Sequence, residues 1–376
     1  MKAASDVCLQ ALDAAFLMRR ENHMQNTELL LKKLTLEEKC ALLSGAETFK
    51  TRGMPEHGIP QIWLSDGPHG LRKQAGESDH LGLNPSVPAT CFPTASAVAN
   101  SWDAALGEEI GAALGEEAAA QEVSVVLGPG LNMKRNPLCG RSFEYFSEDP
   151  YLAGKLAAGY IRGIQSKGVA ACPKHFAVNS QETRRMASDS IVDERTLREI
   201  YLTGFEIAVK EGHPRSIMSS YNLVNGTYAN ENKHLLMEIL RGEWGFDGAV
   251  ITDYCDHHSY MNGDQALRAG GSLWMAGFTG GEMAYETGSN SYTQALRRAA
   301  KETLYMYLHV RVTNQAYADS IGDTSVVRHN FTTSVFGWRH LVALIDIVAV
   351  LLFALAVRGV VIDVKLRKAA KAEKKN

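Results

Sequence analysis

Short apolar runs alternate with longer amphipathic stretches from about residue 30 to residue 307 of this chain. The runs have the length and the β-branched residues of buried strands, and they are 62–65, 123–127, 169–173, 216–219, 249–252 and 272–275. Apolar positions recur at helical spacing in 104–121, 151–166, 193–210, 232–241 and 292–306. This alternation over roughly 250 residues favours a single (β/α)8 TIM-like barrel, an α/β fold. A doubly wound sheet is the alternative, but no Gly-x-Gly-x-x-Gly motif opens a helix after the first strand.

A second apolar region lies near the carboxyl end. Leu341 to Val357 is a run of 17 residues that only Asp346 interrupts, which is close to the length that spans a ~30 Å hydrocarbon core. Trp338 flanks one side, and the other side is basic, with Lys365, Arg367, Lys368, Lys371, Lys374 and Lys375. We therefore expect a transmembrane helix over 338–363. A buried or interfacial amphipathic helix is the alternative, because a charge at the centre of a span costs ~2.5–3.5 kcal/mol.

These patterns divide the chain into five parts. They are an N-terminal extension (1–29), the barrel (30–312), a linker (313–337), the transmembrane helix (338–363) and a basic tail (364–376). Positive charge gathers on the cytoplasmic side of membrane proteins, so the tail is expected to be cytoplasmic. We therefore expect a single-pass protein of the cell membrane with an extracellular barrel. The first 26 residues do not have the apolar core of a secretory signal.

Charge and cysteine usage narrow the function classes. A formal net charge of −3 offers no electrostatic basis for binding nucleic acid. The six cysteines are scattered, without a Cys-x-x-Cys pair or a short Cys/His spacing. This distribution argues against a zinc site or a disulfide framework. We expect neither a metal nor a cofactor.

Polar residues gather where five of the predicted strands end, in 65–72, 128–144, 174–185, 219–222 and 253–254. Each cluster alone has an ordinary structural explanation, such as a turn at Gly67, an ion pair between Arg141 and Glu144, or a helix cap at Asp253. Five clusters at successive strand ends are harder to explain in that way. A barrel brings these ends onto one rim, where barrel enzymes carry out their chemistry.

The residue types at this rim suit the recognition of a sugar. Asp66 offers two acceptor oxygens to hydroxyl groups, and charged or polar donors follow at Arg141, Lys174, His175 and Arg185. An aromatic wall for the apolar sugar face is available from Tyr221, Tyr254 or Trp63. Asp253 lies among cations that should keep it ionised at neutral pH. An ionised carboxylate beside an anomeric carbon is what a retaining glycosidase requires.

The same residues carry a resemblance. The motifs are Asp66-Gly67-Pro68-His69-Gly70, Arg135 to Arg141, Ser147-Glu148-Asp149-Pro150, Lys174-His175-Phe176 with Asn179 and Gln181-Glu182-Thr183, and the Asp253 strand. In this order, over residues 36–277, they resemble the barrel domain of glycoside hydrolase family 3, most closely its β-glucosidase branch.

The resemblance implies a retaining exo-β-glycosidase that removes terminal non-reducing β-D-glucosyl residues through a covalent intermediate on Asp253. It further implies that the sugar is held by Asp66, Arg141, Lys174, His175, Arg185, Tyr221 and Tyr254. Tyr254 stands where the family usually has Trp, so the aromatic face is kept while the indole donor is lost.

One departure from the family pattern concerns the acid/base. Family β-glucosidases take this Glu from a second α/β sandwich domain, and we expect no such domain within these residues. Barrel-only N-acetylhexosaminidases use an Asp/His pair in the loop after the Lys-His strand, and 176–182 lacks their Pro-Gly-His-Gly-Asp motif. Some members carry the domains in reversed order with membrane helices at both ends, and this chain resembles their carboxyl-terminal half.

Three hypotheses therefore stand side by side. The barrel is half of a split or truncated β-glucosidase that needs a partner chain or domain to supply the acid. Or it is self-sufficient, including a β-xylosidase or β-N-acetylhexosaminidase type, with an internal acid among Glu182, Asp256 and His257. Or it is a membrane-anchored sugar-binding module without turnover. The expected small-molecule partner in each case is a β-glucoside or an oligosaccharide.

Overall fold

The computed structural model describes residues 27–76, 78–79, 83–255, 260–275 and 289–310, together with Ile347 and Arg358. The chain divides into two units, Met1–Val326 and Val327–Asn376. The described strands all lie in the first unit. In the second unit the structure describes two residues, both in helical conformation.

Parallel strands form most of a ring in the first unit. Strands β3 (Leu64–Asp66), β4 (Val125–Leu127) and β5 (Ala170–Ala171) pair in that order, and β7 (Ser216–Met218) pairs with β10 (Ala249–Ile251). A parallel bridge between Phe176 and Ser219, just beyond the ends of β5 and β7, joins the two sets of strands. A second parallel bridge, between Ile251 of β10 and Leu273, continues the ring. Strands β4, β5 and β10 consist of buried apolar residues alone, as expected for strands covered on both faces.

An antiparallel hairpin, β1 (Gly45–Glu47) with β2 (Lys50–Thr51), closes this ring. On one side Ser44 bridges to Trp274, and the Gly45 amide donates to the Trp274 carbonyl at 3.0 Å. On the other side the Leu64 amide of β3 donates to the Phe49 carbonyl at 2.8 Å. The ring is therefore barrel-like and leaves β3 and β10 without a free edge, which protects them from pairing with other chains.

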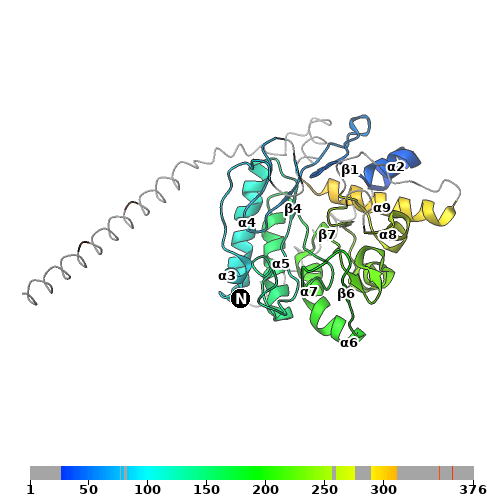
Figure 1. Ribbon diagram of the computed structural model, residues 1–376. Coiled ribbons are helices and arrows are strands. Elements are labelled where there is room, and N and C mark those ends of the chain that lie inside the picture. Colours follow the sequence, from blue (N-terminus) through cyan, green and yellow to red (C-terminus); the bar gives the residue numbers. More distant parts are fainter. Residues whose placement is uncertain are drawn as a thin grey trace, which may run out of the picture. The chain divides into compact units, whose positions relative to one another are not determined.

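Helices cover the outside of the ring (Figure 1). The longer ones are α4 (Ala104–Ala120), α5 (Pro150–Gln165), α7 (Thr203–Gly212), the π-helix η4 (His234–Glu243), α8 (Gly263–Ala269) and α9 (Asn290–Leu308). The shorter elements are α2 (Leu36–Leu42), η1 (Pro55–His57), α3 (Ala95–Ala99), β6 (Asp189–Ser190), α6 (Glu194–Thr196), η2 (Leu197–Leu202), β8 (Leu223–Val224), β9 (Thr227–Tyr228) and η3 (Ala229–Glu231). Side-chain caps set the starts of α4 and α5, where Asp103 and Asp149 each accept two backbone N–H groups.

Helices α4 and α5 pack closely because glycines lie at their contact. A Cβ atom on Gly111 would lie 2.4 Å from the Tyr160 carbonyl oxygen, and one on Gly163 would lie 2.2 Å from the Glu108 carbonyl oxygen. Real Cβ atoms do not approach backbone so closely, so any larger residue here would push the helices apart.

Alternate residues along the strands enter two apolar clusters. Val126, Ala171, Ile217 and Val250 pack with residues of α4, α5, α7 and η4. Their neighbours Val125, Ala170, Met218 and Ala249 pack with each other, with Trp274 and with residues of α9. Successive side chains of a strand point to opposite faces, so each strand of the ring contributes residues to both clusters.

The predicted barrel-like α/β fold is confirmed, with a difference in detail. Each predicted strand run overlaps a strand or, for 272–275, a bridged segment, and each predicted helical stretch overlaps a helix. Within the described ranges, however, the ring holds five parallel strands, and the antiparallel hairpin β1–β2 takes part in its closure. The hairpin residues carry no long apolar run, so the sequence pattern did not reveal them.

The prediction of a transmembrane helix is wrong for the residues that the structure describes. Among the residues that the structure describes, no helix is both long enough and apolar enough to cross a membrane. Helix α9 has 19 residues, but it carries Arg297, Arg298, Lys301 and Glu302. Within the predicted span 338–363, only Ile347 and Arg358 belong to the described residues.

Candidate active site

The polar residues predicted for the site follow the carboxyl ends of the parallel strands. They are Asp66 at the end of β3, Arg141 in the loop after β4, Lys174 and His175 after β5, and Asp253 after β10. Because these strands run parallel, their carboxyl ends meet on one rim of the ring. Hydrogen bonds and ion pairs link Asp66, Lys174, Arg141 and His175, with Glu144 between Lys174 and Arg141, and Asp253 Oδ2 lies 3.7 Å from His175 Nε2.

The buried Lys174 ammonium lies at the centre of this group. It donates to Asp66 Oδ1 at 2.8 Å and lies 4.0 Å from Glu144 Oε2. The Lys174 side chain is 4% exposed, whereas that of Asp66 is 32% exposed, so the Asp66 carboxylate is the more accessible of the two groups. Burial pushes the pKa of Asp66 upward, but Lys174, Arg72 and Arg141 outweigh it and hold that pKa below its ordinary value.

Both the backbone and the ring of His175 form hydrogen bonds. Its amide donates to Asn132 Oδ1 at 2.7 Å, and Asn132 Nδ2 donates back to its carbonyl at 2.8 Å. Around the ring, Arg141 Nη2 lies 3.0 Å from Nε2 and the Tyr145 hydroxyl lies 3.0 Å from Nδ1. Burial, helped by Arg141, Lys174 and Arg185, lowers the pKa of His175 well below its ordinary value, so the ring is neutral.

Asp253 has one engaged and one free carboxylate oxygen. Oδ1 accepts the Tyr254 amide at 2.8 Å. Oδ2 is buried, lies 3.7 Å from His175 Nε2, and has no hydrogen-bond partner among the described residues. Burial raises the pKa of Asp253, and the guanidinium groups of Arg141 and Arg185 offset part of this rise. The sequence predicted the influence of the cations but not the larger influence of burial.

The remaining predicted residues line the next part of the rim. The Arg185 guanidinium lies 4.6 Å from the centre of the Tyr221 ring and pairs with Glu182 at 3.1 Å. The Tyr221 hydroxyl donates to the Tyr254 carbonyl at 2.6 Å, so Tyr221 holds the backbone that carries Asp253. Tyr254 is half-buried.

Trp63, one of the candidates for the aromatic wall, lies elsewhere. It precedes β3, at the opposite end of the strand from Asp66. The ammonium groups of Lys50 and Lys73 lie over its ring in cation–π contacts, each 4.5 Å from the ring centre. Of the internal acid candidates, Glu182 is engaged by Arg185 and Asn179. Asp256 and His257 lie outside the described residues.

Sequence reasoning gave no role in the site to three residues that shape this group. Glu144 forms an ion pair with Arg141 and lies beside Lys174, so it is more than a helix-entry pair. Tyr145 contacts His175, and the Tyr260 hydroxyl donates to the Asp253 carbonyl at 3.3 Å. Glu144 is the last residue of the polar cluster 128–144 and Tyr145 follows it, which is the one signal that pointed to them.

Lys174→Ala is expected to lower the free energy of unfolding by about 3 kcal/mol, because it leaves buried and half-buried carboxylates without their cation. Denaturant titration near neutral pH measures this loss. Lys155→Ala is the control, since Lys155 pairs with Glu211 on the surface at 2.6 Å and should cost less than about 1 kcal/mol. Paired Asp66 has a lowered pKa, so the Lys174 contribution is present above about pH 4 and fades as the pH falls further. Equal losses in the two variants would contradict this prediction.

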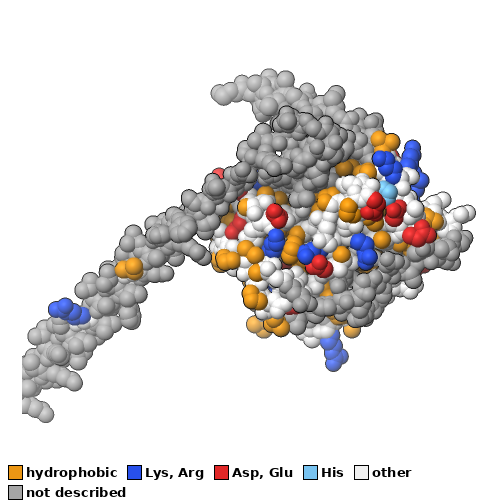
Figure 2. All heavy atoms as spheres, turned by 90° about the horizontal axis from the view of Figure 1, so that it is seen from above, with side chains coloured by type: hydrophobic (Ala, Val, Ile, Leu, Met, Phe, Trp, Pro, Cys, Tyr) orange, Lys and Arg blue, Asp and Glu red, His pale blue; other side chains and the backbone are white. Residues whose placement is uncertain are grey.

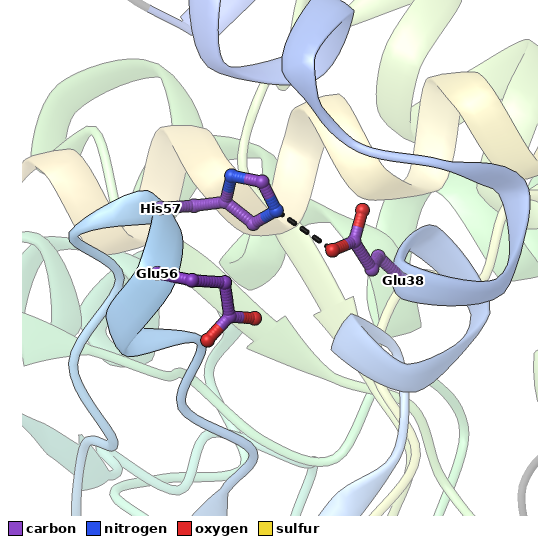
Figure 3. A group of neighbouring side chains, drawn as sticks. All are labelled: Glu38, Glu56 and His57. Atoms are coloured by element: carbon purple, nitrogen blue, oxygen red, sulfur yellow. Dashed lines mark hydrogen bonds and ion pairs between the residues drawn. The ribbon is translucent and has the colours of Figure 1, made fainter.

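A separate group of possible metal ligands lies on α2 and η1, which contribute nothing to the site above. His57 Nε2 lies 2.7 Å from Glu38 Oε1, and the carboxylate of Glu56 lies nearby (Figure 3). The other oxygen of Glu38 accepts the Thr35 amide at 2.7 Å and completes a capping box at the start of α2. The hydrogen bond between His57 and Glu38 therefore has a structural explanation, since it attaches η1 to α2.

The surface of the described residues shows no concentration of one charge in the view of Figure 2. Basic and acidic side chains are interspersed there with apolar ones. This distribution agrees with the small net charge of the chain.

Comparison with known proteins adds a family to this geometry. The sequence model described as "Glycosyl hydrolase family 3 N terminal domain" matches residues 41–284. The chain is 57% identical to thermostable beta-glucosidase B of Acetivibrio thermocellus over 225 residues, which are 60% of this chain and 30% of that protein. It is 47% identical to the exo-alpha-(1->6)-L-arabinopyranosidase of Bifidobacterium longum over 270 residues, which are 70% of this chain and 35% of that protein.

Solved structures agree with these matches. Beta-glucosidase 3B from Thermotoga neapolitana in complex with alpha-D-glucose superposes with a TM-score of 0.69 and 37% identity, covering 77% of this chain and 44% of that one. The family 3 beta-glucosidase of Bifidobacterium adolescentis gives a TM-score of 0.69 and 40% identity, covering 75% and 40%. The chain thus spans about a third of the length of the two curated relatives and less than half of these solved chains. The family model covers more than half of the chain, and the chain therefore belongs to glycoside hydrolase family 3.

Proposed function

We propose that this barrel carries the nucleophile and the innermost sugar site of a retaining exo-β-glycosidase that acts on terminal β-D-glucosyl residues. The observation that carries the proposal is Oδ2 of Asp253, a buried carboxylate oxygen without a hydrogen-bond partner among the described residues. It lies at the end of a barrel strand, close to Arg141 and His175. A carboxylate oxygen that is not engaged in a hydrogen bond keeps its lone pair available for attack on an anomeric carbon.

In the first step, a lone pair of Asp253 Oδ2 bonds to the anomeric carbon as the bond from that carbon to the aglycone oxygen breaks. The aglycone leaves with a proton from a general acid. In the second step, water attacks the same carbon, gives a proton to the conjugate base of that acid, and releases Asp253. Two displacements at one carbon retain its configuration.

The neighbours of Asp253 suit the sugar hydroxyl groups. The partly open Asp66 carboxylate is positioned to accept from two of them, and Lys174, Arg141 and Arg185 supply charged donors. Tyr254 offers a half-buried aromatic face at the end of the same rim. Each of these contacts orients the sugar while leaving the nucleophile free.

The general acid is proposed to come from outside the described residues, on a second domain or a partner chain. Glu144 is occupied by Arg141 and Lys174, and Glu182 by Arg185 and Asn179. The curated relatives are about three times as long as the part that this chain covers, which leaves room for such a domain.

A mechanism-based probe tests this proposal. With 2,4-dinitrophenyl 2-deoxy-2-fluoro-β-D-glucoside, the fluorine slows both displacements and the good leaving group restores the first, so the covalent intermediate accumulates. Peptide mapping by mass spectrometry is expected to find the fluoroglucosyl group on Asp253. A label on another residue would remove Asp253 from this role. Saturable glucose binding without any label would instead support a sugar-binding module without turnover.

The similarity to an arabinopyranosidase calls for one further comparison of substrates. Release of 4-nitrophenol from the β-D-glucoside is expected to be faster than from the α-L-arabinopyranoside. The reverse order would keep the retaining mechanism and change the sugar.

A further inference from the structure

The Tyr145 hydroxyl touches the site from behind His175. Tyr145 is 1% exposed, and its hydroxyl lies 3.0 Å from His175 Nδ1 and accepts from Asn179 Nδ2 at 3.5 Å. Burial raises the pKa of Tyr145 well above its ordinary value, so the hydroxyl stays neutral. Which of the two groups, the phenol or the imidazole, donates the hydrogen bond between them depends on the tautomer of His175.

The opposite nitrogen of the ring decides the tautomer. A guanidinium group has N–H donors and no acceptor. Arg141 Nη2 lies 3.0 Å from His175 Nε2, so Nε2 must be the acceptor in this hydrogen bond. A neutral imidazole carries its single proton on the other nitrogen, and His175 therefore donates from Nδ1 to the Tyr145 hydroxyl.

This arrangement controls what His175 presents to Asp253. Nε2 is the nitrogen 3.7 Å from Asp253 Oδ2. A proton on Nε2 would direct an N–H group at the carboxylate, stabilise its charge and make it a weaker nucleophile. A lone pair on Nε2 leaves Oδ2 without a donor, as observed among the described residues.

We propose that Arg141 and Tyr145 together hold His175 as the neutral Nδ1–H tautomer, so that Nε2 accepts from Arg141 and offers no N–H to the nucleophile. Tyr145 is then a positioning residue that acts through His175. The tautomer follows from the hydrogen bonds alone, whereas its effect on turnover rests on the proposed role of Asp253.

The first experiment observes the tautomer and needs no turnover. In the full chain labelled with ¹⁵N-histidine, His175 is assigned as the signal that is lost in His175→Gln. Its Nδ1 is expected to give a protonated, pyrrole-type resonance and its Nε2 an unprotonated, pyridine-type one. Neutron diffraction from deuterated crystals gives the same answer without a variant, as a deuteron on Nδ1. A proton on Nε2, alone or together with Nδ1, would overturn the proposal.

The second experiment separates positioning from a merely structural role. Tyr145→Phe removes the acceptor for Nδ1–H, which favours transfer of the ring proton to Nε2 and a new hydrogen bond to Asp253. We expect kcat for 4-nitrophenyl β-D-glucoside to fall about tenfold. The acid limb of its pH profile should also move to lower pH, because a donated N–H lowers the pKa of a carboxyl group. The other charged or titratable groups around Asp253 are unchanged by the substitution; they are Arg141, Arg185, Lys174, Tyr221, Cys255 and Tyr260.

Tyr160→Phe is the matched control. Tyr160 is as deeply buried as Tyr145, but it lies on α5 and its hydroxyl has no hydrogen-bond partner among the described residues. Removing that hydroxyl should leave both the rate and the acid limb in place. A rate loss in Tyr145→Phe without movement of the acid limb would show that Tyr145 only supports packing, and would overturn its positioning role. If the chain has no turnover at all, the proposed function fails while the tautomer measurement still decides this inference.

Discussion

Replacing Asp253 by Asn is expected to reduce turnover of an activated aryl β-glucoside on the order of 10⁴–10⁶-fold, the range found when a central residue of another covalent hydrolase is removed. The amide has the shape of the carboxylate, and its oxygen is able to accept the Tyr254 amide as Asp253 Oδ1 does at 2.8 Å. The local fold should therefore survive, while the lone pair that bonds to the anomeric carbon is lost. Steady-state rates on 2,4-dinitrophenyl β-D-glucoside measure the effect.

A control and a rescue make this result specific. Asp103→Asn also exchanges a carboxylate for an amide, at the N-cap of α4, where Asn serves equally well, so the rate should not change. Sodium azide added to Asp253→Asn should restore part of the rate and yield the α-glucosyl azide, because a small anion replaces the missing nucleophile. Activity in Asp253→Asn close to that of the parent chain would exclude Asp253 as the nucleophile.

The second large effect concerns the leaving group. We expect kcat/KM of this chain for cellobiose to be about 10²–10⁴-fold below the value that general-acid assistance would give, since the alkoxide of a sugar needs a proton as it leaves. An aryl glucoside with an acidic phenol needs little protonation. A series of aryl glucosides is therefore expected to show rates that depend steeply on the pKa of the phenol.

A supplied acid is the matching control. Co-expression with the remaining part of the Acetivibrio thermocellus relative should raise the rate on cellobiose and leave the best aryl substrate nearly unchanged. Rapid hydrolysis of cellobiose by this chain alone would contradict the prediction. It would point to an internal acid, with Glu182 or the segment 256–257 as the first residues to replace.

The sequence predicted the elements that have a strong periodic signal. The predicted helical stretch 193–210 is covered by α6, η2 and α7, which begin after a cap from Asp193 and end at Gly212. Along the way it contains a π-helical segment, η2, which no pattern of apolar positions distinguishes from an α-helix. The hairpin β1–β2 escaped prediction because its short strands depend on partners more than 200 residues away, such as Trp274.

The site was predictable as a set of residues but not as a network. Asp66, Lys174 and Asp253 stand at strand ends, and strand ends are visible in the sequence. Trp63 does not join the site because it precedes β3 and so lies at the end of the strand opposite to Asp66, where Lys50 and Lys73 from other segments contact its ring. The pKa of Asp253 is raised because the side chain is buried, and this burial is known only from the folded structure.

The closure of the ring has a consequence for the order in which the chain folds during synthesis. Strands β3, β4, β5, β7 and β10 occur in the sequence in the order in which they lie around the ring, so each is able to add to the growing sheet as it leaves the ribosome. Ser44 must wait for Trp274, which is translated 230 residues later. Until then the early hairpin has only β3 as a neighbour, and its other edge is open. Nascent chains stalled before residue 274 should therefore be more sensitive to proteases and more dependent on chaperones than chains stalled after α9.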